Sequence, residues 1–249
     1  MPQNSLNTNK VALITGSAQR IGAAIATYLH ANGWRVVIHY YTSKAAAESL
    51  VAQLNQQRAD SAWAIAADLN NANTTHGVIE KIVHHWQRLD ALINNASVFK
   101  PTPVADVTLK QWQELFTINV EAPFFLSQAA IPYLKQTQGN IINITDTHAN
   151  GRPMKNYSVY CMSKAGLLMQ TQALARELAP DIRVNAVAPG VSMWEGELSA
   201  KQQEILKRTP LKRAGLADEI AKAVYYLLTD ATYTTVNVLY VDGGRLLFN

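Results

Sequence analysis

The feature that most constrains this chain is an alternation of short apolar segments with longer helical ones, repeated from end to end. The apolar segments are rich in Val, Ile and Ala and are bounded by turn residues, which is typical of buried strands. We predict strands at 11–14, 34–40, 61–67, 90–94, 140–145, 182–187 and 235–241, with a first helix that Asn32-Gly33 ends and further helices at 44–57, 74–88, 108–137, 157–179 and 217–229. This order predicts one α/β domain over 1–249, built on a doubly wound, seven-stranded parallel sheet.

Composition excludes several classes of protein. Of the 249 residues 48% are hydrophobic and only 16% are charged, against roughly 25% charged residues in an average globular chain, so we do not expect disorder. No apolar run approaches the roughly 20 residues of a membrane-spanning helix, and residues 1–9 are a polar N-terminal tail without the apolar core of a secretory signal. Cys161 is the single cysteine, which excludes an intrachain disulfide framework. We therefore expect a cytoplasmic protein.

Charge and histidine spacing limit the partners further. The net charge of +4 is spread thinly along the chain, so neither nucleic acid nor a membrane surface is an expected partner. The histidines show no metal-ligand spacing, and no metal is expected. Ligands of a parallel sheet bind outside the carboxyl ends of its strands, so the residues that follow each strand carry the functional prediction.

The first two strand ends suggest a dinucleotide site. Gly16 and Gly22 form a glycine turn that leads into a helix, whose backbone N–H groups and positive dipole end suit a diphosphate; a tight turn without a ligand is the alternative. The second strand is followed by no Asp or Glu that would hold a ribose hydroxyl, which favours NADP over NAD. Ser43 and Lys44 are candidate ligands of a 2′-phosphate, although Lys44 also fits a solvated loop.

Later strand ends add polar candidates. Asp68 is a candidate acceptor for an adenine amino group or a helix cap. Asn94 and Asn95 end a buried strand and need polar partners, supplied by neighbouring loops or by bound adenosine. Tyr160 and Lys164 are four residues apart, so they share one face of a helix, where an ammonium group favours a phenolate for acid or base work.

Together these residues, with Thr15, Asn119 and Pro189-Gly190, resemble the short-chain dehydrogenase/reductase family over essentially the whole chain. The resemblance implies a Rossmann-type fold in which Tyr160 is the proton donor, Lys164 holds the nicotinamide ribose and lowers the Tyr160 pKa, and Asn119 organises a proton-relay water. It also implies NADPH as the cofactor, held by Gly16, Ser17, Arg20, Ile21, Gly22, His39, Tyr40, Ser43, Lys44, Asp68, Leu69, Asn95, Ala96, Tyr160, Lys164, Pro189 and Gly190.

Two departures from the common family pattern narrow the prediction. Arg20 replaces the middle glycine of the first loop, and Asp146 replaces the catalytic serine after the fifth strand, with Thr147 as a possible hydroxyl substitute. With the segments 94–99, 101–103 and 242–245, these departures resemble the pteridine reductases, a group that includes dihydromonapterin reductases. The resemblance implies a catalytic set of Asp146, Tyr160, Lys164 and Asn119, and a pterin bound by Arg20, Ser97, Phe99, Asp146, Tyr160 and Trp194.

Some positions differ from that group. Thr42 stands where a basic residue is common, which makes Lys44 the substitute to test, and the interval from Asp146 to Tyr160 is one residue longer, which a loop insertion near Asn150-Gly151 would absorb. Phe99 would stack on a pterin or simply anchor its loop. A substrate lid is expected at 191–211, where Met193 and Trp194 would cover a flat ligand or pack.

The resulting hypothesis is NADPH-dependent reduction of a 7,8-dihydropterin, of the dihydromonapterin or dihydrobiopterin type, to the tetrahydropterin. The hydride would go to the ring carbon next to N5, and N5 would take a proton from water or Asp146. The alternatives are a ketone or 3-oxoacyl thioester reductase of the same family and a non-catalytic NADP-binding sensor. The family resemblance also predicts a homotetramer that buries helices 108–137 and 157–179, which would account for the low charged fraction.

Overall fold

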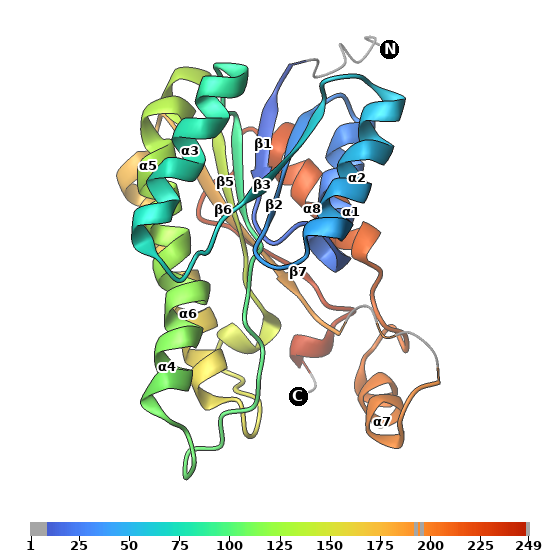
Figure 1. Ribbon diagram of the computed structural model, residues 1–249. Helices are drawn as coiled ribbons and strands as arrows, with labels where there is room; N and C mark the ends of the chain where they lie inside the picture. The colour runs from blue at the N-terminus through green and yellow to red at the C-terminus, as the bar shows by residue number, and fades with distance from the viewer. Residues whose placement is uncertain (1–8, 192–193, 195–196, 248–249) are drawn as a thin grey trace.

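The computed structural model describes residues 9–191, 194 and 197–247, and Figure 1 traces its layers. One parallel sheet runs through the centre in the order β3-β2-β1-β4-β5-β6-β7. Its strands are β1 Val11–Ile14, β2 Arg35–Tyr40, β3 Ala62–Ala66, β4 Ala91–Asn94, β5 Asn140–Ile144, β6 Arg183–Pro189 and β7 Val238–Val241. The seven-stranded parallel sheet is therefore confirmed. The strand order reverses between β1 and β4, which makes this pair the switch point at which such sheets bind ligands.

Helices cover both faces of the sheet (Figure 1). They are α1 Arg20–Ala31, α2 Lys44–Gln57, α3 Ala72–Trp86, α4 Leu109–Phe116, α5 Ala122–Thr137, α6 Ser158–Leu178, α7 Ala200–Arg208 and α8 Ala217–Thr229. The helices α1, α2 and α8 pack on one face, and α3, α5 and α6 pack on the other. Among the described helices none is long and apolar enough to cross a membrane.

Strand β1 shows why the strands are apolar throughout. Successive side chains of a strand point to opposite faces, so Ala12 and Ile14 join the core under α1 and α8, while Val11 and Leu13 join the core under α3 and α5. All four are fully buried. A strand with helices on both sides has no face to give to water, and the run of apolar residues follows from that.

Three segments differ from the predicted elements. The helical region 108–137 is two α-helices joined by a π-helix, η1 Thr117–Glu121. The last strand begins at Val238 rather than near residue 235, because Val236 has a left-handed backbone (φ 63°) that cannot continue a strand. The expected lid contains helix α7, which was not predicted, while Met193 and the tail residues 1–8 lie outside the described part of the chain.

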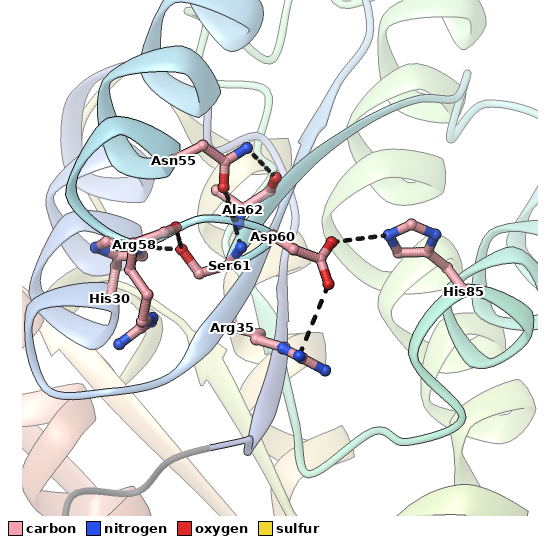
Figure 2. Close-up of polar contacts among 8 residues, drawn as sticks. All are labelled: His30, Arg35, Asn55, Arg58, Asp60, Ser61, Ala62 and His85. Atoms are coloured by element: carbon pink, nitrogen blue, oxygen red, sulfur yellow. Dashed lines mark hydrogen bonds and ion pairs between the residues drawn. The ribbon is translucent and has the colours of Figure 1, made fainter.

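Figure 2 shows the amino ends of the strands, on the edge opposite the ligand edge. The Asn55 side chain accepts hydrogen bonds from the backbone N–H groups of Ser61 and Ala62, which fixes the turn into β3. Asp60 lies between two basic side chains, 3.7 Å from a guanidinium nitrogen of Arg35 and 3.8 Å from His85 Nε2. At this edge the polar side chains therefore contact one another and the backbone of the turn.

His39 of β2 fixes the turn between β1 and α1. The Gly16 N–H donates to Nδ1 of His39 at 3.0 Å, and Nε2 lies 3.2 Å from the carbonyl oxygen of Ala67. Because Nδ1 accepts, the ring is neutral and carries its hydrogen on Nε2. Burial lowers the pKa of His39 to about 4, and the bond to Ala67 opposes this shift. A neutral His39 therefore joins β1, β2 and the end of β3.

The lowered pKa predicts a loss of stability in acid. Between pH 6.5 and 4 the unfolded chain binds a proton at His39 and the folded chain does not, so the free energy of unfolding falls as pH falls through this window. From pH 7 to pH 5 this residue accounts for about 2 kcal/mol. Urea unfolding at both pH values should show that loss in the wild type and not in His39→Gln. The exposed control His76→Gln should retain it; an equal pH dependence in His39→Gln would contradict the assignment.

Candidate active site

A cavity of ≈ 730 Å³ lies at the carboxyl ends of the strands. Segments that follow β1 to β6 line it, and Arg245 lines it from beyond β7. The structure brings most of the predicted site residues to this cavity: Gly16, Arg20, Ile21, Gly22, His39, Tyr40, Ser43, Asp68, Leu69, Asn95, Ala96, Ser97, Phe99, Asp146, Tyr160, Lys164, Pro189, Gly190 and Trp194. Ser17, Lys44 and Asn119 do not line it.

The turn after β1 is shaped for close approach of a ligand to backbone. Gly16 has φ +60°, and a Cβ built at Gly22 would lie 2.6 Å from the carbonyl oxygen of Gly16, so neither position accepts a larger residue without strain. The N-cap residue of α1, Gln19, makes no side-chain cap hydrogen bond. First-turn N–H groups of α1 are thus left for an anion, and this cradle fits the diphosphate of a dinucleotide.

Side chains from β4 hold that turn in place. The Thr15 hydroxyl accepts the backbone N–H groups of Asn95 and Ala96, both at 2.9 Å. The Asn95 amide donates to the carbonyl oxygens of Thr15 at 2.8 Å and Gly16 at 3.1 Å. Asn94 is bound deeper, where its amide donates to Asn143 at 2.8 Å. The amide nitrogens of both asparagines therefore donate within the protein, whereas the side-chain oxygen of Asn94 is buried without a hydrogen-bond partner among the described residues.

Only some of the residues predicted to bind a phosphate after β2 line the cavity. Tyr41, Thr42 and Ser43 line the cavity, and no carboxylate stands among them. Lys44 lies on the first turn of α2 and is 3.7 Å from Glu48, with both side chains exposed. Ser17 is buried, and its hydroxyl donates to the Ile14 carbonyl at 2.7 Å, so it supports the turn.

Asp68 follows β3 and faces the same cavity. One of its carboxylate oxygens accepts from the backbone N–H of Asn70 at 2.9 Å and from the Asn70 side-chain amide at 2.8 Å. The Asp68 backbone carbonyl accepts from the Thr74 hydroxyl at 2.6 Å. The turn into α3 therefore orients Asp68, and a carboxylate oxygen remains for an amino group.

Asp146 and Tyr160 form the closest functional pair. The Tyr160 hydroxyl donates to Oδ2 of Asp146 at 2.7 Å, and Oδ1 of Asp146 accepts the backbone N–H of His148 at 2.7 Å. The longer interval between the two residues does not separate them. The loop between them contains Gly151, whose φ is +74°, and an insertion near Asn150-Gly151 remains a prediction. Carboxylate and phenol are thus held ready to share a proton.

The expected direction of the Tyr160 pKa is corrected by this pairing. Burial raises the pKa of Tyr160 well above its ordinary value, and the charge of Asp146 and its hydrogen bond act in the same direction. The predicted lowering by Lys164 is wrong in this arrangement, because the residue beside the hydroxyl is an acceptor that needs the proton. Tyr160 therefore holds its proton firmly, as a proton donor does before reaction.

Lys164 lies one helical turn from Tyr160 and is almost completely buried. Its ammonium group donates to the Ile144 carbonyl at 2.9 Å. Burial lowers the pKa of Lys164 to about 8, while the negative charge of Asp146 favours the protonated form. A buried cation beside the Asp146–Tyr160 pair is well placed to bind a polar group of a ligand.

Asn119 lies outside the cavity lining and supports the site through hydrogen bonds. It belongs to the π-helix η1 and is fully buried. Its amide oxygen accepts the Val98 N–H at 2.8 Å, and its amide nitrogen donates to the Val98 carbonyl at 3.0 Å and to Ser163 at 2.9 Å. The side chain therefore ties the loop after β4 to α6, next to Lys164; the predicted relay water remains a prediction.

Aromatic rings form one wall. Phe99 stacks on Tyr157 with centroids 4.8 Å apart and meets the edge of Tyr160, also at 4.8 Å. Phe99 is nevertheless 57% exposed, so ring surface remains for a flat ligand. Ser97 is exposed beside it, and Trp194 is half-buried in the cavity wall.

Sequence reasoning missed several functional positions. Thr15 belongs to the motif that carries the family resemblance, and its hydroxyl also accepts two N–H groups that hold the turn. Tyr157 precedes α6 and stacks on Phe99. Arg245 lines the cavity; it belongs to the segment 242–245 that carries the resemblance, but no binding role was predicted for it. Within the described residues, no group of three His, Cys, Asp or Glu is arranged to hold a metal.

Comparisons with known proteins identify the family of this chain. The family model for "Enoyl-(Acyl carrier protein) reductase" matches residues 16–245. A 3-oxoacyl-[acyl-carrier-protein] reductase from Synechocystis is 36% identical over 97% of this chain and 98% of its own length. Pteridine reductase 1 from Leishmania tarentolae is also 36% identical, over 96% of this chain and 97% of its own.

A solved structure is similar throughout. The crystal structure of a blue fluorescent protein from a metagenomic library, in complex with NADPH, has a TM-score of 0.90 to this chain. Its sequence is 33% identical, and the match covers 96% of this chain and 98% of that one. With the family model, the relatives and the fold in agreement, the chain belongs to the short-chain dehydrogenase/reductase family.

Proposed function

We propose that this protein is an NADPH-dependent reductase of 7,8-dihydropterins, of the dihydromonapterin or dihydrobiopterin type. The observation that carries the proposal is the carboxylate of Asp146, 2.7 Å from the Tyr160 hydroxyl, at the position where the family's carbonyl reducers have a hydroxyl. A hydroxyl stabilises the oxygen of a ketone by donating to it, whereas a carboxylate only accepts hydrogen bonds. An acceptor beside a proton donor suits a ring with N–H groups better than a simple carbonyl.

NADPH, when bound, supplies the hydride for the ring carbon that forms a double bond with N5. The chain's residues supply the proton and the orientation. Tyr160 and Asp146 hold one proton between them, and this pair, directly or through water, protonates N5 as its charge develops. Phe99 offers a flat surface for the pterin, and the Lys164 ammonium binds the nicotinamide ribose.

The choice of NADPH rests on the residues after β2. A 2′-phosphate carries negative charge, and a carboxylate at this position would repel it. The chain has Tyr41, Thr42 and Ser43 along this part of the cavity, followed at once by the N-terminus of α2. Hydroxyl groups, backbone N–H groups and a positive helix end all favour a phosphate.

A homotetramer is proposed for the same protein. Large apolar side chains are exposed on three helices on one side of the sheet, among them Trp112 of α4, Phe124 of α5 and Met169 of α6. Exposed apolar side chains on neighbouring helices favour an association surface on a chain with few charges. Burial of these helices between subunits would explain why only 16% of the residues are charged.

The proposed activity is tested with a panel of substrates. With NADPH we expect turnover of 7,8-dihydromonapterin or 7,8-dihydrobiopterin, because Asp146 and Tyr160 serve a ring nitrogen. Asp146→Asn and Tyr160→Phe should each lower kcat about 100-fold, with NADPH binding retained. Loss of absorbance at 340 nm measures the rates, and fluorescence titration measures the binding.

A control variant and a competing substrate complete the test of the proposed activity. Asp60→Asn removes an exposed carboxylate at the opposite edge of the sheet and should behave as the wild type. Acetoacetyl thioester is included as the substrate of the alternative activity. The similarity to the Synechocystis 3-oxoacyl-[acyl-carrier-protein] reductase is the reason to test this alternative. NADPH oxidation with the thioester and with none of the dihydropterins would refute the proposal, and tight NADPH binding with no turnover at all would favour a sensor.

Cofactor selection has its own test. Ser43→Asp places a carboxylate at the N-cap of α2, where it preserves the helix. We expect it to weaken NADPH binding at least about tenfold and NADH binding much less. Lys44→Ala should have the smaller effect on NADPH, because Lys44 pairs with Glu48 outside the cavity wall. If Lys44→Ala is the more damaging change by calorimetry, Lys44 and not the loop holds the phosphate.

The assembly is measured by light scattering after size-exclusion chromatography. We expect a mass near four times the 27.4 kDa of one chain. Met169→Glu places a charge on the exposed apolar face of α6 and should shift the mass downward. A wild-type protein that elutes as a monomer would remove this proposal and leave the proposed activity untouched.

A further inference from the structure

Arg245 is positioned by a dedicated turn at the end of β7. The Asp242 carboxylate accepts the backbone N–H groups of Gly244 and Leu246, both at 2.8 Å. Gly243 and Gly244 have φ of 64° and 82°, and a Cβ built at Gly244 would lie 2.8 Å from Pro210. The turn requires both glycines and directs the next residue, Arg245, into the cavity.

The guanidinium of Arg245 has no hydrogen bond or ion pair among the described residues, although it is half-buried. Neither of the two nearby carboxylates forms an ion pair with it: Asp242 accepts the N–H groups of the turn, and Asp146 accepts from Tyr160 and His148. Burial lowers the pKa of Arg245, and the charges of Asp146 and Asp242 act against this shift. A partly desolvated cation with free donors is costly unless a ligand binds it.

The other cations of the cavity have different surroundings. Lys164 donates to Ile144, and Arg20 lies at the glycine turn on the side of the cavity that suits a diphosphate. Arg245 lies on the opposite side: its short helix, η3 Arg245–Leu247, packs against η2 Thr147–Ala149, which follows Asp146 directly. Arg245 therefore faces the catalytic pair from beyond β7 and is available to a substrate.

The chemistry of the proposed substrate links this position to a side chain. In a 7,8-dihydropterin the carbon that receives the hydride is also the carbon that carries the substituent. A group beside Asp146 therefore lies near the start of that substituent. Guanidinium presents paired N–H donors that match the two oxygens of a phosphate or a carboxylate.

We propose that Arg245 is a specificity-determining residue that binds an oxyanion on the substrate's side chain, so that the protein prefers dihydropterins with a phosphate or carboxylate on that substituent over neutral ones. This inference rests on the proposed function. It names the substrate class of the same site and adds a residue that the catalytic set does not contain.

The test compares three substrates at saturating NADPH: neutral 7,8-dihydroneopterin, its monophosphate, and 7,8-dihydrofolate with its carboxylates. In the wild type we expect a KM at least about tenfold lower for one or both anionic substrates. Arg245→Gln should remove most of this difference by raising the anionic KM values, and Arg245→Lys should retain part of it, because the charge remains and the paired donors are lost. Calorimetric binding of the same compounds to the NADP⁺ complex gives a readout independent of turnover.

The outcomes separate the inference from the proposed function. The control Arg213→Gln removes an exposed arginine that pairs with Glu219 outside the cavity, and it should keep the wild-type preference. Equal KM values for neutral and anionic substrates in the wild type, or an equal loss for all three in Arg245→Gln, would overturn the inference while the reductase activity stands. Failure of every dihydropterin to bind or react would overturn both. The anion that shows the preference identifies its source as phosphate or carboxylate.

Discussion

The site depends on a reciprocal set of hydrogen bonds between Thr15 and Asn95. The Thr15 hydroxyl receives the N–H groups that follow β4, and the Asn95 amide returns bonds to the carbonyls that follow β1. Two strands that are neighbours in the sheet but about 80 residues apart in sequence are thereby joined where the strand order reverses. These bonds hold a glycine turn of unusual geometry. Gly16 has a left-handed backbone, and Gly22 has no room for a side chain.

Charge is distributed unevenly over the cavity that these bonds help to form. The cofactor half offers backbone N–H groups and hydroxyls to a phosphate, and its charged residues Arg20 and Asp68 are not buried. The substrate half contains a buried lysine, a carboxylate that receives two hydrogen bonds, and a half-buried arginine. Lys164 is almost completely buried, and ionic groups interact more strongly in a buried site than in water. The residues proposed to transfer the proton and the arginine proposed to select the substrate therefore lie in the same half of the cavity.

Sequence patterns predicted the sheet and most cavity residues, because strand ends of a parallel sheet converge whatever the details of the loops. They failed where one residue's geometry decides the outcome. Val236 shortens β7 through its backbone angle, and Lys44 turns toward Glu48 instead of the cavity. The pKa of Tyr160 is raised first by burial and then by Asp146, a partner 14 residues away that the folded loop brings within 2.7 Å. Such pairings are set by three-dimensional packing and leave no periodic signal.

The π-helix at Thr117–Glu121 has a consequence for how this chain can change in length. Each residue of an α-helix advances by about 100° around the axis, so the wide turn sets the angular phase between α4 and α5. With that phase Leu115, Asn119 and Leu126 all face inward. Deleting one residue here would rotate α5 by about 100° and turn Leu126 away from the core. The packing of α4 and α5 therefore fixes the number of residues between them.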